Sequence, residues 1–188
     1  MKFVKAILGL CMILMMGVAC SPNATDAPVY SVVSEGSLSD GATLPAPTEA
    51  VVLTVTGLIG TTNVEDRIEM DTPMLQSMRT VEYTVTDPFE KKEVVYQGIL
   101  MSDLLDLWQV PAEATTLSVL ALDDYQAEVP IEDLRNYPVI YAMQADGVPM
   151  PISTRGPAMF VFPYEHFEFD QQRYNDYWVW QIKSIEVK

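Results

Sequence analysis

Residues 145–163 read ADGVPMPISTRGPAMFVFP, and the rest of the sequence can be arranged around this stretch. The Asp146-Gly147 pair is typical of a two-residue β-hairpin turn. Prolines restrict the backbone on both sides of Arg155, and the apolar run 158–162 that follows predicts a buried strand. The stretch therefore predicts a hairpin, a rigid loop that presents one arginine, and a strand in the core.

The sequence on either side of this stretch predicts a mixed α and β fold in which strands predominate. Residues 80–86 alternate Val81, Tyr83 and Val85 with polar residues, as in a half-buried strand. Further strands are expected at 51–56, 94–96, 117–122, 125–129, 139–143 and 178–187. Short helices are expected at 73–78, after an Asp71 cap, at 104–108, after a Ser102-Asp103 cap, and at 131–136. In the last strand, Trp178, Trp180 and Ile182 would share one face.

The N-terminal end predicts export. Lys2 and Lys5 precede the uncharged apolar run 6–18. This run is too short for a membrane-spanning helix, which needs about 20 residues, and it is typical of a secretory signal. The residues that follow, Gly17-Val18-Ala19-Cys20-Ser21, resemble the lipobox of bacterial lipoproteins.

This resemblance implies that residues 1–19 are removed and that Cys20 is acylated at the new N-terminus. Ser21, in place of an aspartate, then implies sorting to the outer membrane, so the expected location is periplasmic and lipid-anchored. An ordinary signal peptide with a chance cysteine is the alternative. Residues 20–49 are rich in Ser, Ala, Thr, Pro and Gly and predict a flexible tether. Residues 50–188 are then expected to form a single domain.

The composition excludes several classes of site. The two cysteines are Cys11, in the signal, and Cys20. The expected mature domain therefore has no disulfide and no thiol for redox, zinc or hydrolytic chemistry. His166 is the single histidine. No transition metal held by imidazole or thiolate is expected.

The charge of the chain argues against nucleic acid as a partner. The formal net charge is −15, and loss of the two lysines in the signal makes the remainder more acidic. Phosphate backbones would be repelled, and so would an anionic lipid surface. Attachment to a membrane would then depend on the acyl chains of Cys20.

Five segments in order resemble the molybdopterin-binding domain of the sulfite-oxidase family, across essentially all of residues 50–188. They are TVTGLI at 54–59, YQGILMSDLLDLWQV at 96–110, LSVLALDDYQAEVPIEDL at 117–134, VIYAMQADGVPMPISTRGPAMFVFP at 139–163 and YWVWQIKSIEV at 177–187. Small, single-domain periplasmic members are the most similar. The resemblance implies an α+β, strand-rich fold with a pterin site among loops at one edge of the sheet.

The chain departs from the family pattern at the metal ligand. Family enzymes hold molybdenum through a cysteine, whereas the corresponding segment here offers only Thr84, Thr86 and Asp87. The family loop usually has histidine or asparagine at the position of Arg155 and an arginine shortly after, which is missing here. Some cysteine-lacking members are thought to bind a free pterin in the periplasm and to control a membrane-bound cyclic-di-GMP enzyme. The resemblance to these members implies a pterin ligand, or molybdopterin without thiolate ligation, and no metal.

A flat, polar pterin ring calls for a plane to stack on and for hydrogen-bonding groups along its edge. Arg155, followed by Gly156, is the expected contact to the ring carbonyl or the side-chain hydroxyls, although it could merely pair with a surface carboxylate. The remaining candidates are stacking residues and carboxylates. Trp178 and Trp180 could stack on the ring or fill the core. Tyr174 and Tyr177 could form a lid over the ring together with Arg173. Asp123 or Asp124 could pair with the 2-amino edge of the ring or serve only as turn residues.

Three functions remain open at this point. The first is a lipid-anchored pterin sensor that regulates a membrane signalling enzyme. The second is a molybdopterin-dependent oxidoreductase with an unusual ligand in place of cysteine. The third is a scaffold of this fold that has lost its ligands and acts only through protein contacts.

Overall fold

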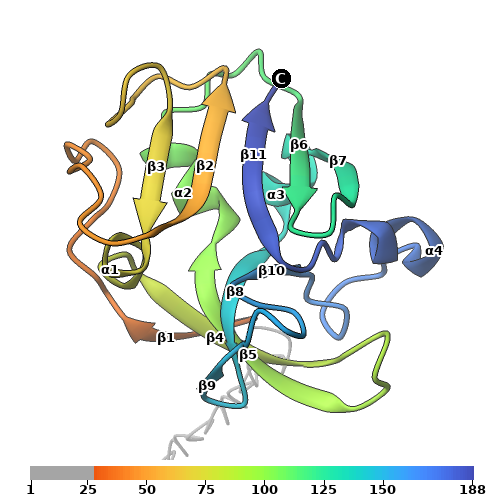
Figure 1. Cartoon of the computed structure of the whole chain (residues 1–188). Coiled ribbons are helices and arrows are strands. Elements are labelled where there is room, and N and C mark those ends of the chain that lie inside the picture. The colour runs from red at the N-terminus through yellow and green to blue at the C-terminus, as the bar shows by residue number, and fades with distance from the viewer. Residues whose placement is uncertain (1–27) are drawn as a thin grey trace, which may run out of the picture.

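The computed structural model describes residues 28–188, which form two β-sheets and several short helices (Figure 1). The first sheet has the order β1 (Ser31–Ser34), β4 (Thr80–Thr86), β5 (Glu93–Leu100), β8 (Ile140–Ala145) and β10 (Met159–Val161), and β9 (Val148–Pro149) pairs with β8. The second has the order β3 (Ile68–Asp71), β2 (Val51–Gly57), β11 (Ile182–Val187), β6 (Thr116–Ala121) and β7 (Gln126–Pro130). The helices are α1 (Thr72–Gln76), α2 (Met101–Leu107), α3 (Ile131–Asn136), α4 (Gln171–Tyr174) and the 3₁₀ turn η1 (Asn175–Tyr177). The predicted strand-rich α+β single domain is confirmed.

The strand patterns in the sequence correspond to the faces that the sheets bury. In β4, Val81, Tyr83 and Val85 are buried, whereas Thr84 and Thr86 are exposed. Asp71 caps α1 as predicted, because its side chain accepts a hydrogen bond from the backbone N–H of Met74. Local polar residues therefore begin the helix, and apolar alternation orients the strand.

The predicted hairpins are also present. Asp146 and Gly147 both have positive φ, 51° and 75°, and connect β8 to β9. Asp124, with φ of 67°, lies in the turn between β6 and β7. Both turns use residues that tolerate the left-handed region.

The C-terminal strand β11 lies in the middle of the second sheet, parallel to β2 and antiparallel to β6 (Figure 1). The last strand is therefore a central one, and the segment that leads into it crosses the end of the first sheet. There the backbone N–H of Ile182 donates to the carbonyl of Ala158 at 3.1 Å, and that of Phe160 to the carbonyl of Val179 at 3.1 Å. These bonds join the 158–160 segment to the approach of β11.

Three expectations differ from the structure. Residues 31–49 lie along the domain instead of forming a flexible tether: β1 pairs with β4, and Leu38 and Leu44 are buried. Apolar residues that are sparse in sequence still find places in the core, which composition alone could not show. The helix predicted to begin after Ser102 begins at Met101, and its cap residue Leu100 makes no side-chain cap hydrogen bond.

The last strand is also shorter than predicted. It begins at Ile182, and the two tryptophans precede it in irregular backbone, because Gln181 has φ of 54° and redirects the chain. Trp178 and Trp180 therefore do not share a strand face with Ile182. The predicted signal peptide, residues 1–19, and the predicted acylation site Cys20 lie outside the described residues. Within residues 28–188, no helix has both the length and the apolar character needed to cross a bilayer.

Candidate functional site

The site is built from the loop that connects β4 to β5, residues 87–92. Its ends are closed by backbone bonds between Asp87 and Lys92 at 2.8 Å and between Lys91 and Asp87 at 2.9 Å. Inside the loop, Oδ1 of Asp87 accepts hydrogen bonds from the backbone N–H groups of Phe89 (2.8 Å) and Glu90 (2.7 Å). Asp87 therefore performs turn chemistry with one carboxylate oxygen, and its other oxygen faces the interior.

Arg155 reaches this oxygen from the loop between β9 and β10. The backbone of that loop is held by bonds from Gly156 N–H to the carbonyl of Pro151 (2.9 Å) and from Gln181 N–H to the carbonyl of Arg155 (3.0 Å). A Cβ at Gly156 would collide with the carbonyl of Met150, so only glycine fits this close approach. The sequence prediction of a rigid loop around Arg155 is consistent with these contacts.

The Arg155 side chain, 11 % exposed, ends in a network of three partners. Its Nη1 donates to Oδ2 of Asp87 and, at 2.9 Å, to Oη of Tyr96, and its Nη2 lies 3.2 Å from Oε1 of Glu90. Tyr96 in turn donates its hydroxyl proton to Oδ2 of Asp87 at 2.6 Å. We call Asp87, Tyr96, Glu90 and Arg155 the Arg155 network.

Aromatic rings surround this network. The Arg155 guanidinium lies over the Trp180 ring, 4.4 Å from its centroid, which is a cation–π distance. Phe89 meets the same tryptophan edge-on, with ring centroids 5.0 Å apart, and Trp178 packs edge-on against Tyr96 at 6.1 Å. The two tryptophans therefore support the network from the segment that precedes β11.

The ionisation of the network follows from these contacts. Burial acts to raise the pKa of Asp87, but hydrogen bonds from Arg155, Tyr96 and the backbone of Glu90 and Phe89 outweigh it, so the pKa lies below its ordinary value. Burial, together with the hydrogen bond to Asp87, raises the pKa of Tyr96 well above its ordinary value. At neutral pH the buried part of the network therefore consists of the Asp87 carboxylate, the Arg155 guanidinium and the neutral Tyr96 phenol.

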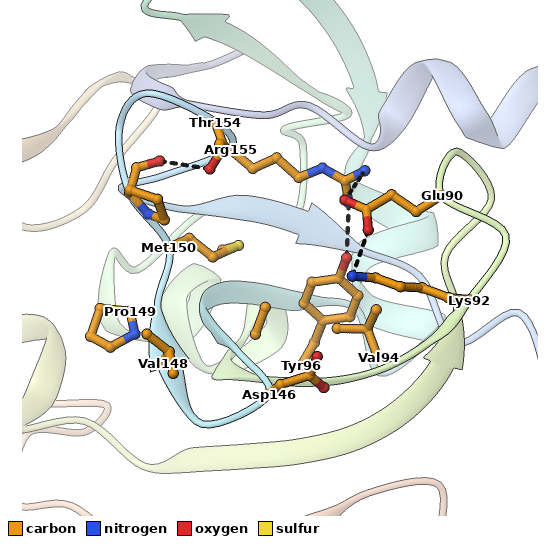
Figure 2. Close-up of a pocket in the computed structure, with 12 residues that line it drawn as sticks. Glu90, Lys92, Val94, Tyr96, Asp146, Val148, Pro149, Met150, Thr154 and Arg155 are labelled. Atoms are coloured by element: carbon orange, nitrogen blue, oxygen red, sulfur yellow. Dashed lines mark hydrogen bonds and ion pairs between the residues drawn. The ribbon is translucent and has the colours of Figure 1, made fainter.

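A cavity of about 220 Å³, which we call the polar cavity, opens beside the network (Figure 2). Figure 2 shows Arg155 extending toward Glu90 above the Tyr96 hydroxyl, with Lys92 paired to Glu90 at 2.7 Å. The lining combines apolar residues, such as Val94 and Met150, with four charged residues, Glu90, Lys92, Asp146 and Arg155. This combination of apolar walls and a few charged groups is typical of a small-ligand site, although the volume is below that of drug-sized sites.

A second hollow of about 230 Å³, which we call the aromatic hollow, lies on the tryptophan side. It is lined by Phe89, Trp178 and Trp180, with Asp123 among its polar residues. Phe89 and Glu90 are neighbours in one loop, so that loop contributes to the walls of both spaces. Arg155 lines the polar cavity and Trp180 lines the aromatic hollow, so the stack of these two side chains connects the two spaces.

The structure brings together only part of the predicted site. Arg155 stacks on Trp180, Trp178 packs against Tyr96 of the network, and Asp123 lines the adjoining aromatic hollow. Tyr174 and Tyr177 pack instead against Phe162, at ring centroids of 5.5 and 6.2 Å, and Arg173 donates to the Tyr177 hydroxyl. Asp124 occupies the β6–β7 turn and pairs with Lys183 at 3.1 Å, as in the turn-residue alternative.

Sequence reasoning missed the partners of Arg155. Arg155 was expected to face a ligand or a surface carboxylate, whereas Asp87 is fully buried and Tyr96 is 1 % exposed. The Asp87-Pro88 pair predicted only a turn, which it does form. A weak signal for Tyr96 was available, because in β5 it alternates with exposed Val95 and so points inward with Val94.

Molybdenum, which enzymes of the sulfite-oxidase family hold through a cysteine, does not fit the residues present here. Oδ1 of Asp87 accepts two backbone N–H bonds, and Oδ2 accepts the Tyr96 hydroxyl and Arg155. A carboxylate offers about four lone-pair sites, so none is left for a metal. Thr84 and Thr86, the other two residues of that segment, are exposed on the outer face of β4. Thus none of the three offers a free ligand inside the site.

No family model matches the chain, and no curated protein sequence matches it. Among solved structures, the chain is similar to the sulfane dehydrogenase SoxCD from Paracoccus pantotrophus, with 17 % sequence identity and a TM-score of 0.54. The match covers 72 % of this chain but only 37 % of that chain. At this identity the likeness shows the fold alone, and it supports a distant sulfite-oxidase-like fold.

Proposed function

We propose that this protein binds a pterin in the polar cavity and acts as a ligand sensor. The observation that supports the proposal most directly is the position of Arg155, which lines the cavity next to a carboxylate, Glu90, and an amine, Lys92. A pterin has a donor edge, with the 2-amino group and a ring N–H, and acceptors at the ring carbonyl and nitrogens. The cavity therefore offers complementary groups to both edges.

Glu90 is the proposed partner of the donor edge. Its side chain is 44 % exposed and pairs with Lys92 and Arg155. Such partly exposed ion pairs contribute only about 0–1 kcal/mol, so a ligand can replace one of them at little cost. Lys92 and Nη2 of Arg155 would then donate to the acceptor edge, while Val94 and Met150 contact the ring.

The rest of the network acts as a rigid support. Nη1 of Arg155 is already bound to Asp87 and Tyr96, and the guanidinium plane lies on Trp180. A donor that is held in place before binding loses little conformational freedom when the ligand arrives. In this proposal Trp178, Trp180 and Asp87 position Arg155 and do not contact the ring.

The sensor role rests on the loop that contains Glu90. The neighbouring Phe89 is 45 % exposed, so a shift of Glu90 on binding changes an apolar group at the surface that a partner could contact. Together with the expected acylation of Cys20, this supports a periplasmic, lipid-anchored sensor whose partner is a membrane-bound cyclic-di-GMP enzyme. The resemblance to cysteine-lacking family members is the only basis for naming that enzyme class.

Calorimetric titration of the purified full chain with tetrahydromonapterin and with neopterin tests the binding. We expect binding that Glu90→Gln weakens at least tenfold, since the neutral amide loses the charge-assisted bond to the donor edge. Glu93→Gln, an exposed change at the start of β5, is the matched control and should bind like the wild type. Absence of heat with both pterins, for a protein shown to be folded by circular dichroism, would refute the proposal.

Two further measurements test the lipid anchor and the regulation of the partner enzyme. Cys20→Ser should release the protein from membranes of its native host, whereas an ordinary signal peptide would leave its distribution unchanged. In membranes that contain the partner, added pterin should change cyclic-di-GMP turnover with the wild type but not with Glu90→Gln. Equal turnover with both proteins would favour a scaffold that acts only through protein contacts.

A further inference from the structure

The aromatic hollow is enclosed by rings from three separate segments of the chain. Phe89 comes from the β4–β5 loop and Tyr125 from the turn between β6 and β7, and the two tryptophans come from the approach to β11. The Tyr125 hydroxyl donates to the backbone carbonyl of Asp176 at 3.0 Å, which joins the turn to that approach. Trp178 is buried and Trp180 half-buried, so the tryptophans form the inner wall. Phe89 and Tyr125, 45 % and 44 % exposed, form the outer wall.

The charged groups that line the hollow are acidic. Asp123 and Asp176 are among the lining residues, and within residues 28–188 no lysine, arginine or histidine is. Neither carboxylate has an ion-pair partner in the described part of the chain, whereas the neighbouring Asp124, which lies outside the hollow, pairs with Lys183 at 3.1 Å. A ligand in the hollow would therefore meet two uncompensated negative charges, which favours a cation.

The rings add to this preference, because the face of an aromatic ring carries partial negative charge. Phe89 lies at 80° to Trp180, with centroids 5.0 Å apart, and at 65° to Trp178, with centroids 6.2 Å apart. Rings at such angles form a corner and not a flat stack, so a rounded cation can contact several of them at once. Arg155 already lies over one face of Trp180, which leaves only the opposite face of that ring to a ligand.

The lining also distinguishes between kinds of cation. A primary ammonium has three N–H donors that need acceptors when it leaves water, and the inner wall of the hollow is aromatic. A quaternary ammonium has methyl groups in place of these donors, and aromatic cages are the usual recognition site for it. A cavity of about 150 Å³ is known to hold benzene, which is at least as large as a trimethylammonium group. The hollow, at about 230 Å³, therefore has room for such a group.

We propose that the aromatic hollow binds a small organic cation with a quaternary ammonium group. The ammonium contacts the rings of Phe89, Tyr125 and the two tryptophans, and Asp123 and Asp176 attract its charge. The ligand must carry a net positive charge, because a carboxylate or phosphate beside the ammonium would be repelled by the same two aspartates. None of the groups proposed to contact the pterin lines the hollow, so the two sites are separate and their ligands differ in class.

The test compares choline with 3,3-dimethyl-1-butanol, which has the same shape but a carbon atom in place of the charged nitrogen. Binding is measured by proton NMR titration of the full chain in an uncharged detergent, with micelles alone as the blank. The wild type should bind choline at least about fivefold more tightly than the alcohol, because only choline interacts through its charge with the rings and the carboxylates. Absence of choline binding, or equal affinity for both probes, would overturn the proposal.

Two variants test the location of the site. Phe89→Leu keeps an apolar side chain but removes the ring, so it should weaken choline binding about threefold and leave the alcohol unchanged. Asp123→Asn can keep the bond from the backbone N–H of Tyr125 to Oδ1 but removes the charge, so it should also weaken choline binding about threefold.

Asp124→Asn is the matched control, because it makes the same change at the next residue of the turn, outside the hollow. It should bind choline like the wild type. Equal effects of the two Asp→Asn changes would contradict the assignment, and so would unchanged choline binding, or parallel losses for both probes, in Phe89→Leu.

A further probe distinguishes a free cation from a lipid head group. Glycerophosphocholine carries the same ammonium group as choline, together with the phosphodiester of a phospholipid head group. It should bind more weakly than choline, because its phosphate would lie near Asp123 and Asp176. Binding as tight as that of choline would contradict the requirement for a net positive charge and would indicate a phospholipid ligand.

Discussion

Replacing Arg155 by methionine would remove the cation from the Arg155 network while keeping a flexible apolar chain next to Trp180. It would leave Asp87, which is fully buried, without its counter-ion. Breaking a buried pair in this way costs about 3–5 kcal/mol. Tyr96 and two backbone N–H groups still bind the carboxylate, so we expect the lower end, about 3 kcal/mol. For a chain of this size that lowers Tm by roughly 6–12 °C.

Asp87→Asn removes the other charge of the pair, the carboxylate that Arg155 contacts. The asparagine Oδ1 can keep the two backbone bonds from Phe89 and Glu90, whereas its amide would face the Arg155 guanidinium, donor against donor. The double variant Asp87→Asn/Arg155→Met leaves no uncompensated charge. We therefore expect it to be more stable than the sum of the two single effects predicts, by about 2 kcal/mol.

Urea unfolding followed by tryptophan fluorescence measures all three variants. Arg135→Met is the matched control, since Arg135 pairs with Asp106 at 2.9 Å but both side chains are exposed, at 40 % and 51 %. Removing that surface pair should cost less than about 1 kcal/mol. Additive effects of Asp87→Asn and Arg155→Met, within about 0.5 kcal/mol, would refute a direct energetic coupling between the two side chains.

Three further predictions concern Asp87, Tyr141 and Leu44. The pKa of Asp87 is lower in the folded protein than in the unfolded chain. The stabilisation by its carboxylate is therefore complete above about pH 4, the unfolded value, and is lost as the pH falls through the folded value. The difference in unfolding free energy between wild type and Asp87→Asn should be constant near neutral pH and should shrink in acid. Tyr141→Phe removes a buried hydroxyl that makes no hydrogen bond to the described residues, so the free energy of unfolding in urea should rise by about 1 kcal/mol; a fall would reveal a partner for that hydroxyl. Leu44→Ala should lower the free energy of unfolding by at least about 2 kcal/mol, because Leu44 is 5 % exposed. Val33→Ala, on exposed β1, is the control and should change it by less than about 0.5 kcal/mol. Equally small effects of both changes would indicate that residues 31–49 form a flexible tether.

Local residue patterns were enough to predict several individual elements. Alternation in 80–86, the Asp71 cap, the Asp146-Gly147 turn and the prolines around Arg155 depend on residues close together in the chain, so periodicity and turn chemistry predicted β4, α1, the β8–β9 hairpin and a rigid loop. The charge and the two cysteines likewise limited the chemistry, because these are properties of composition.

Which distant residues come into contact could not be predicted from such local patterns. Asp87 and Arg155 are 68 positions apart, and nothing in either segment shows that a turn carboxylate would be buried against that guanidinium. The same holds for Leu44, which joins the core from a polar segment, and for Tyr174 and Tyr177, which pack on Phe162 away from Arg155. Long-range contacts depend on how two sheets and the approach to β11 pack together, and that packing is a property of the whole chain.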